Sequence, residues 1–495
     1  MMKKAIAFLA SVAVLGTSLA AVPVAAQSAG GGAAQSIRAD RAASAAILKW
    51  HEVMLDTHAR SATPGEAGAG QNGGPLRTTR GFAMTMISVF DAVNAFDQRY
   101  RSYNSIATAQ NNASKEVAIA YAAHDVLTAV WNGQSARLAQ VLADDLAAIG
   151  ASGAALNRGR TVGQAAAAAI LANRTGDGAQ IGEVPFGGGG RIATGTTDFF
   201  GNGINSGQTF AGQWQVDPEN PGNPVALGAS WGAVKPFALV NGAQFRAKPF
   251  PAIGTAKYRQ IYNDVKAIGA SQDTPGSTGT ARTHFIGNYW GYEGTPQLGV
   301  PPRLYAQIAV ELAERADIDR SIELARYFAL VHISMADAGI AVWDTKYYYN
   351  VGRPVTAIRV EDGDPLTQTV PGWKPYGISR VNLATYNRQT PPFPAYSSGH
   401  AAFGSSMFEA ARGFMPNNTS FTFVSEEYDG EGVDPVDGST RPLVPVRYRN
   451  LEVASVENAR SRVFNGSHWQ PDSDLGKLQG EQVARFARAN LFRRR

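Results

Sequence analysis

Apolar residues recur at intervals of three and four along much of the chain, which is the spacing of helices that bury one face. The pattern begins with Ile47, Trp50 and Met54. It predicts further helices in the first half, over residues 82–96, 114–130, 138–149 and 162–171. We therefore expect an N-terminal helical bundle over residues 27–175.

The helical spacing returns in the second half of the chain. Two prolines at residues 301–302 are typical of a first helical turn, and apolar residues follow them at helical intervals. A longer apolar series over residues 324–342 would bring Lys346 near the C-terminal end of its helix. Residues 255–495 are therefore expected to form a second helical bundle, and the fold class is all-α.

Between these two parts, residues 176–254 show no helical period. Four consecutive glycines at residues 187–190 and six prolines between residues 218 and 251 interrupt any regular spacing. The segment is predicted to be irregular, either an excursion over the surface or a linker between the bundles.

The two halves also resemble each other at a fixed offset of 246 positions. The residues that recur without a gap are Ile87, Ser88, Asp91, Ala92, Ala95, Tyr103 and Asn104, which match Ile333, Ser334, Asp337, Ala338, Ala341, Tyr349 and Asn350. These matches indicate a duplicated helical unit, although two similar amphipathic helices would also produce them. Tyr100 stands in the first unit where the second has Lys346. Only the second unit would therefore carry a cation at this position, which could help to bind an anion.

The first residues have the pattern of a secretory signal peptide. Lys3 and Lys4 precede an apolar run that extends to about Val24, and small residues follow as far as Ala26. We expect a signal peptide over residues 1–26 and an exported protein, periplasmic or secreted. No later stretch is long and apolar enough to span a bilayer.

Composition narrows the classes further. Hydrophobic residues make up 44% and charged residues 17% of the chain, as in soluble globular proteins. The net charge of +5 is modest and no basic stripe alternates with aromatic residues, which argues against nucleic acid binding. The chain contains no cysteine, so disulfides and thiolate metal sites are excluded.

The central chemical motif is Ser398-Gly399-His400, which leads from a loop into a run of small residues typical of a helix. A helix N-terminus favours an anion, because its first N–H groups are free and its dipole is positive. The Ser398 hydroxyl and the Gly399 N–H can donate to such an anion. His400 can exchange a proton near neutral pH.

Cationic residues and a second histidine flank this motif. Lys346 and Arg353 lie upstream and Arg462 lies downstream, and such groups bind oxyanions. His468 offers a ring nitrogen as nucleophile or metal ligand, and Asp472 could hold its other ring N–H. Each residue alone is explained by a surface charge or a core histidine, but the three motifs in this order form a specific pattern.

In these motifs the sequence resembles the vanadium-dependent haloperoxidases, which share their anion site with type 2 phosphatidic acid phosphatases and bacterial acid phosphatases. The matching stretches are residues 346–354, 398–400 and 461–472, within a similar region over about 289–476. One position departs from the family pattern, because the residue before the serine is usually proline and here is Ser397.

The resemblance implies vanadate as cofactor, and hydrogen peroxide, a halide and an organic acceptor as partners. Vanadate would be held by hydrogen bonds from Lys346, Arg353, Ser398, Gly399 and Arg462. His468 would bind vanadium as the metal ligand, oriented by Asp472, and His400 would act as acid and base. The product would be hypohalous acid. A homodimer is consistent with the sequence, and neither nucleic acid nor a membrane is expected as a partner.

Two alternatives use the same residues. In an exported acid phosphatase, His468 would attack phosphorus to give a phosphohistidine intermediate, and His400 would protonate the leaving group. An exported helical scaffold that binds an oxyanion without turnover would need neither the two histidines nor the orienting Asp472.

Three further residues bear on this choice. Trp343 and Phe393 resemble the aromatic pair that lines the halide pocket of chloroperoxidases, and bromoperoxidases typically carry histidine in place of Phe393. Two ordinary core aromatics would look the same. Glu293 resembles the family's carboxylate that holds an arginine or the acid–base histidine. The resemblance therefore favours oxidation of chloride or bromide.

Overall fold

The computed structural model describes residues 25–185, 212–221, 225–383 and 388–495, with side chains from residue 39 onward except at 184–185. The described chain is mostly helical, which confirms the all-α class. The predicted signal peptide lies almost entirely outside the described residues. Within them, no helix combines the length and the apolar character that crossing a bilayer requires.

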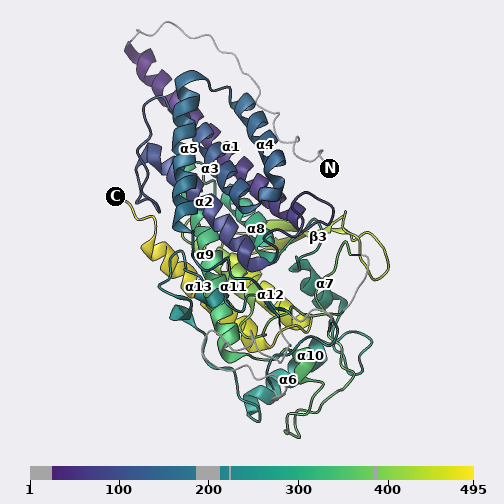
Figure 1. Cartoon of the computed structure of the whole chain (residues 1–495). Helices are drawn as coiled ribbons and strands as arrows, with labels where there is room; N and C mark the ends of the chain where they lie inside the picture. Colours follow the sequence, from purple (N-terminus) through teal and green to yellow (C-terminus); the bar gives the residue numbers. More distant parts are fainter. Residues whose placement is uncertain (1–24, 186–211, 222–224, 384–387) are drawn as a thin grey trace.

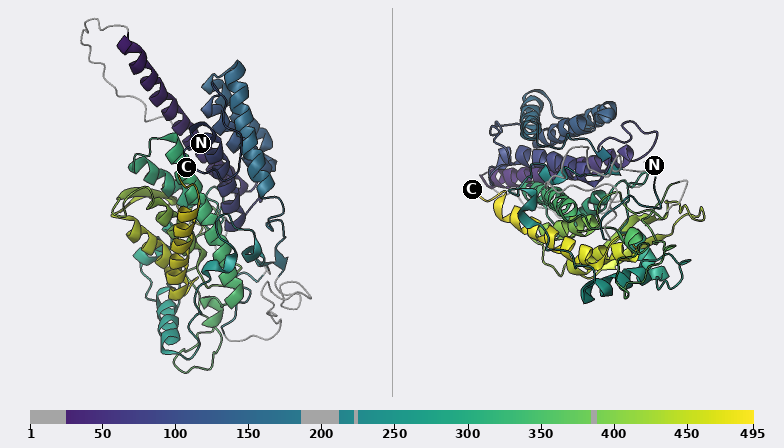
Figure 2. Two further views of the ribbon diagram at one scale, coloured as in Figure 1. Left: turned by 90° about the vertical axis from the view of Figure 1, so that its left-hand side faces the viewer. Right: turned by 60° about the horizontal axis from the view of Figure 1, so that its bottom comes forward.

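Helices of the first half form one side of the molecule (Figures 1 and 2). They are α1 (Ala25–Ser61), α2 (Pro75–Asp97), α3 (Lys115–Val130), α4 (Ser135–Ile149) and α5 (Gly153–Asn173). Helix α5 begins earlier than its apolar spacing predicted, because small residues rather than apolar ones form its contact with α3. A Cβ atom at Gly159, which precedes the predicted range, would lie only 2.9 Å from the Cβ atom of Val117 in α3.

Helices of the second half lie on the other side (Figure 2). They are α6 (Ala256–Ile268), α7 (Ala281–Tyr289), α8 (Pro301–Arg315), α9 (Ser321–Tyr349), α10 (Pro354–Ala357), α11 (Gly399–Ala411), α12 (Leu451–Phe464) and α13 (Gln470–Asn490). Helix α9 packs against α2 of the first half and against α11 and α13 of the second, so it joins the two sides.

An antiparallel hairpin, β3 (Phe421–Asp429) and β4 (Leu443–Tyr448), interrupts the second bundle. This hairpin was not expected from the sequence. Alternate residues of β3 are buried, with Phe421 and Phe423 in the core and Thr422 exposed. This period of two runs over few residues, so the surrounding helical spacing conceals it.

The segment between the bundles is irregular, as predicted, in its described parts. These contain only β1 (Val184–Pro185), β2 (Val225–Ala226), η2 (Trp231–Ala233) and η3 (Gly242–Phe245). The segment does more than run over the surface, because η2 and η3 both pack on α9. The glycine run at residues 187–190 lies outside the described residues.

Two aspartates related by the offset of 246 positions bind irregular segments to helices α2 and α9. Asp91 of α2 accepts hydrogen bonds of 2.8 Å from the backbone N–H groups of Tyr103 and Asn104. Asp337 of α9 accepts three backbone N–H groups, from Phe237, Ala238 and Leu239, at 2.7, 2.7 and 2.9 Å. Both carboxylates are fully buried, and this shared role is what a duplicated unit predicts.

The variant Asp337→Asn should lower the free energy of unfolding by about 2–3 kcal/mol, since one amide oxygen cannot serve three buried donors. Denaturant titration followed by circular dichroism measures the change. Asp144→Asn, at an exposed position of α4, is the matched control and should have little effect. Equal stability of the two variants would contradict the assigned role.

Candidate anion-binding active site

Lys346 lies in the last turn of α9, which ends where Asn350 adopts a left-handed conformation. Its side chain is fully buried, and Nζ donates to the carbonyl oxygens of Pro394 and Ala395 at 2.8 and 2.9 Å. These bonds fix the ammonium against the loop that precedes α11. Because an ammonium has three N–H groups, one remains for a ligand.

Arg353 immediately precedes α10 and is also buried. Its Nε donates to the carbonyl oxygens of Pro391 and Phe393, both at 3.0 Å, and its Nη1 donates to that of Ser467 at 2.7 Å. Its Nη2 is buried and has no hydrogen-bond partner among the described residues. Buried guanidinium groups need partners, so this nitrogen marks a place for a ligand acceptor.

His468 and Asp472 form an oriented pair at the start of α13. One carboxylate oxygen of Asp472 accepts hydrogen bonds from His468 Nδ1 at 2.9 Å and from the Trp469 N–H at 3.0 Å. The proton of the imidazole is thereby held on Nδ1. The other nitrogen, Nε2, carries the lone pair and lies 3.3 Å from Arg353 Nη1.

Ser398 caps the N-terminus of α11, where its Oγ accepts the Ala401 N–H at 3.4 Å. The Ser398 N–H donates to the carbonyl oxygen of Asp472 at 2.9 Å, which links this loop to α13. Gly399 occupies the first helical position, where backbone N–H groups lack intrahelical acceptors. A Cβ atom there would lie 3.1 Å from the Trp343 ring.

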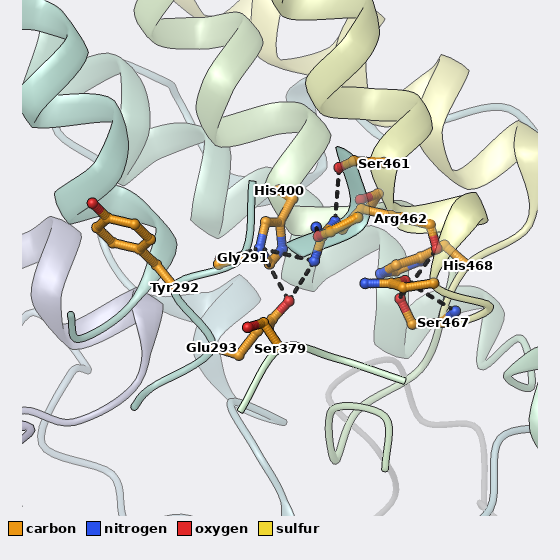
Figure 3. Close-up of polar contacts among 12 residues, drawn as sticks. Gly291, Tyr292, Glu293, Ser379, His400, Ser461, Arg462, Ser467 and His468 are labelled. Atoms are coloured by element: carbon orange, nitrogen blue, oxygen red, sulfur yellow. Dashed lines mark hydrogen bonds and ion pairs between the residues drawn. The ribbon is translucent and has the colours of Figure 1, made fainter. Parts of the chain in front are cut away.

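Arg462, near the end of α12, is the third buried cation (Figure 3). It forms a short ion pair with Glu293 and also donates to the Gly287 carbonyl oxygen. His400 lies beside this pair, with Nε2 3.5 Å from Glu293 and 3.4 Å from Arg462 Nη1. The structure thus brings Glu293, Arg462 and His400 together, from three segments far apart in sequence.

The tautomer of His400 follows from its nearest partner, the Gly291 carbonyl oxygen, which lies 3.0 Å from Nε2. A carbonyl oxygen only accepts hydrogen bonds, so Nε2 carries the proton and Nδ1 carries the lone pair. The side chain is only slightly exposed, as expected for a group that meets a small substrate.

Burial and mutual repulsion shift the titration of these groups. Burial, and then the charge of Arg353, lower the pKa of Lys346 well below its usual value. The pKa values of both site histidines are likewise well below 6.5, owing to burial and then to Arg462 for His400 or to Arg353 for His468. An anion bound in the cluster would oppose these shifts, because it would stabilise the protonated forms.

The same burial acts in the opposite direction on the two carboxyl groups of the site. It raises the pKa of Glu293 to about 7, although the charge of Arg462 opposes the shift. It also raises the pKa of Asp472 to about 7, against the hydrogen bond from the Trp469 N–H.

Trp343 and Phe393 form the aromatic contact expected from the sequence, with ring centroids 4.9 Å apart. Lys346 Nζ lies 5.0 Å from the Phe393 centroid, so this pair borders the cationic cluster. The Trp343 indole N–H donates to the Leu227 carbonyl oxygen at 3.0 Å, and the Tyr347 hydroxyl donates to the same oxygen at 2.8 Å. The irregular segment thus packs against this aromatic pair.

Residues outside the three motifs hold the site in place, and sequence reasoning missed them. Glu427 of β3 is fully buried and accepts the Tyr292 N–H at 2.9 Å, next to both Gly291 and Glu293. Its other oxygen accepts from Ser379 and Arg441, both at 2.6 Å. Glu427 stands in an unpredicted strand with no characteristic spacing, so the sequence offered no signal for it.

Binding of sulfate, an anion that does not titrate near neutral pH, should take up protons. The anion raises the lowered pKa values of Lys346 and His400, so binding should also strengthen as the pH falls. Isothermal calorimetry in buffers of different ionisation enthalpy measures the uptake. Lys346→Met should reduce both uptake and affinity, and proton release on binding would contradict this account of the charges.

Comparison of the sequence with known proteins indicates the family to which the chain is related. Residues 326–494 match the model of the VCPO second helical-bundle domain. Over 300 residues, the chain is 31% identical to the vanadium chloroperoxidase of Curvularia inaequalis. That match covers 52% of this chain and 49% of the relative, so the chain spans about half the length of the curated protein it matches.

Two solved structures share the fold. One is the first bacterial vanadium-dependent iodoperoxidase, with a TM-score of 0.66 and 20% identity over 90% of this chain and 95% of that one. The other is the holo-type bacterial vanadium-dependent chloroperoxidase, with a TM-score of 0.59 and 17% identity over 87% and 95% of the two chains. The solved structures show a shared fold, and the family model, the sequence match and the three motifs show that the chain is related to the vanadium-dependent haloperoxidases.

Proposed function

We propose that this protein oxidises a halide with hydrogen peroxide on vanadate bound at the site described above. The observation that carries the proposal is the convergence of Lys346, Arg353 and Arg462 with two histidines. All three cations are buried, and carbonyl oxygens rather than carboxylates hold Lys346 and Arg353. Such an arrangement is costly unless an anion completes it.

The residues present fit vanadate. The unpartnered Nη2 of Arg353, the third N–H of Lys346 and the first N–H groups of α11 supply donors for its oxygens. His468 Nε2 carries a lone pair for vanadium, because Asp472 holds the proton on Nδ1. When bound, vanadate would supply the Lewis-acid centre that activates hydrogen peroxide toward halide.

The chain's own residues would manage the protons. His400 is neutral at physiological pH because its pKa is lowered, and its Nδ1 lone pair can accept a proton from incoming hydrogen peroxide. Gly291 and Glu293 hold the ring from the opposite side, so its direction is fixed before the substrate arrives. Lys346 would stabilise negative charge that develops on oxygen.

We propose chloride or bromide as the halide, on the basis of the Trp343 and Phe393 pair. The Trp343 indole N–H already donates to the Leu227 carbonyl oxygen, so it is not offered to the halide. The pair would instead present aromatic surface next to the Lys346 ammonium. An acid phosphatase is not favoured, since the chloroperoxidase and the two solved structures compared above are all haloperoxidases. Export to the periplasm or medium remains our proposal from the leader at residues 1–26.

His468→Ala should abolish halogenation and weaken vanadate retention, because the metal ligand is lost, whereas His400→Ala should retain vanadate but turn over slowly. Monochlorodimedone bromination with and without added vanadate measures activity, beside hydrolysis of p-nitrophenyl phosphate. Undiminished halogenation by the His468 variant would refute its role. Activity on the phosphate ester alone would favour the phosphatase instead.

Phe393→His should lower chloride oxidation more than bromide oxidation. An imidazole makes the pocket more polar, and chloride, the more strongly hydrated ion, then gains less from leaving water. The ratio of the two rates, measured at one pH, should shift toward bromide at least severalfold. Phe393→Leu keeps the pocket apolar and serves as the control. An unchanged ratio would remove Phe393 from the halide pocket.

A further inference from the structure

Ser397, at the position where the family pattern has proline, makes a buried side-chain contact. It is fully buried, and its hydroxyl donates to Oε1 of Gln479 at 2.7 Å. Gln479 belongs to α13 and is itself only 1% exposed. The hydroxyl thus joins the anion-binding loop to a helix 82 positions further along the chain.

The other end of the Gln479 amide is equally well occupied. Nε2 lies 2.9 Å from each of three acceptors, the carbonyl oxygens of Phe245 and Ala341 and Oγ1 of Thr345, which share its two N–H groups. These acceptors fix which end of the amide carries nitrogen, so Oε1 must face Ser397. With four partners inside the core, Gln479 has little freedom to move.

Gln479 connects the segments that carry the anion donors. Ser397 precedes Ser398 and Gly399 of the loop, and Thr345 precedes Lys346 of α9. Helix α13 carries Asp472 in its first turn and packs directly against α11. A Cβ at Gly476 would be 2.6 Å from the Ser398 carbonyl oxygen, and one at Gly480 would be 2.2 Å from that of Ala402.

We infer that Gln479 is a positioning residue that sets the anion loop against Lys346 through the hydroxyl of Ser397. The inference rests on the proposed function, because it concerns the same anion site. A proline would stiffen this loop through its own ring. Here a hydrogen bond to a fixed amide restrains the loop, so the donors of Ser398 and Gly399 stay aimed at one point with Lys346.

The test compares the binding of sulfate and orthovanadate by calorimetry in the wild-type protein, Ser397→Ala, Gln479→Leu and the double variant. Each single variant should bind both anions about 10- to 100-fold more weakly, the usual effect of losing a group that orients a ligand-binding residue. The double variant should bind each anion no more weakly than the single variant with the lower affinity, because both changes break the same interaction. Gln482→Leu, half-buried in the same helix and away from the site, is the control and should bind normally.

Other outcomes decide against the inference. If wild-type protein binds and Gln479→Leu binds equally well, or if the two losses add, Gln479 does not act through Ser397 and the proposed function stands. If wild-type protein binds neither anion, the proposed function and the inference both fail. Should Gln479→Leu not fold, Ser397→Ala tests the same hydrogen bond, and unchanged affinity in that variant overturns the inference.

Discussion

Mutual repulsion among three buried cations is the constraint on which the second half of this structure depends. Among the residues that the structure describes, Arg462 forms a direct ion pair with a carboxylate, that of Glu293, whereas Lys346 and Arg353 form none. The other two are held by backbone carbonyl oxygens, which orient a cation without cancelling its charge. The site therefore keeps a positive potential that it would lose if each cation had its own carboxylate. Fixed dipoles and a deficit of negative charge select for an anionic ligand.

Much of this arrangement could be predicted from the sequence. The helices with an apolar stripe were found because burial of one face imposes a period on the residues, as at Trp50 and Met54 of α1. The residues of the cationic cluster were singled out because their chemistry is unusual as a set and their order matches a known pattern, and the structure brings them together. Lys346 was expected near the end of its helix, and it lies in the last turn of α9.

The supports of the site could not be predicted in the same way. Glu427 and Gln479 act through contacts with residues distant in sequence, and nothing in their own sequence neighbourhood distinguishes them from surface polar residues. The start of α5 was missed because its contact with α3 depends on small residues such as Gly159, which carry no hydrophobic signal. The packing of the irregular segment on α9 was missed because proline and glycine remove any period while leaving individual side chains, such as Trp231, buried.

The carbonyl oxygen of Leu227 has a consequence for the way the molecule is built. Leu227 lies in the irregular segment, outside both helical bundles, yet its carbonyl oxygen accepts hydrogen bonds from both Trp343 and Tyr347. A fragment that began at α6 would keep every cation and both site histidines but would leave these two aromatic side chains without their shared acceptor. The aromatic contact beside Lys346 is therefore a joint product of the second bundle and the chain that precedes it, so the second bundle alone does not form it completely.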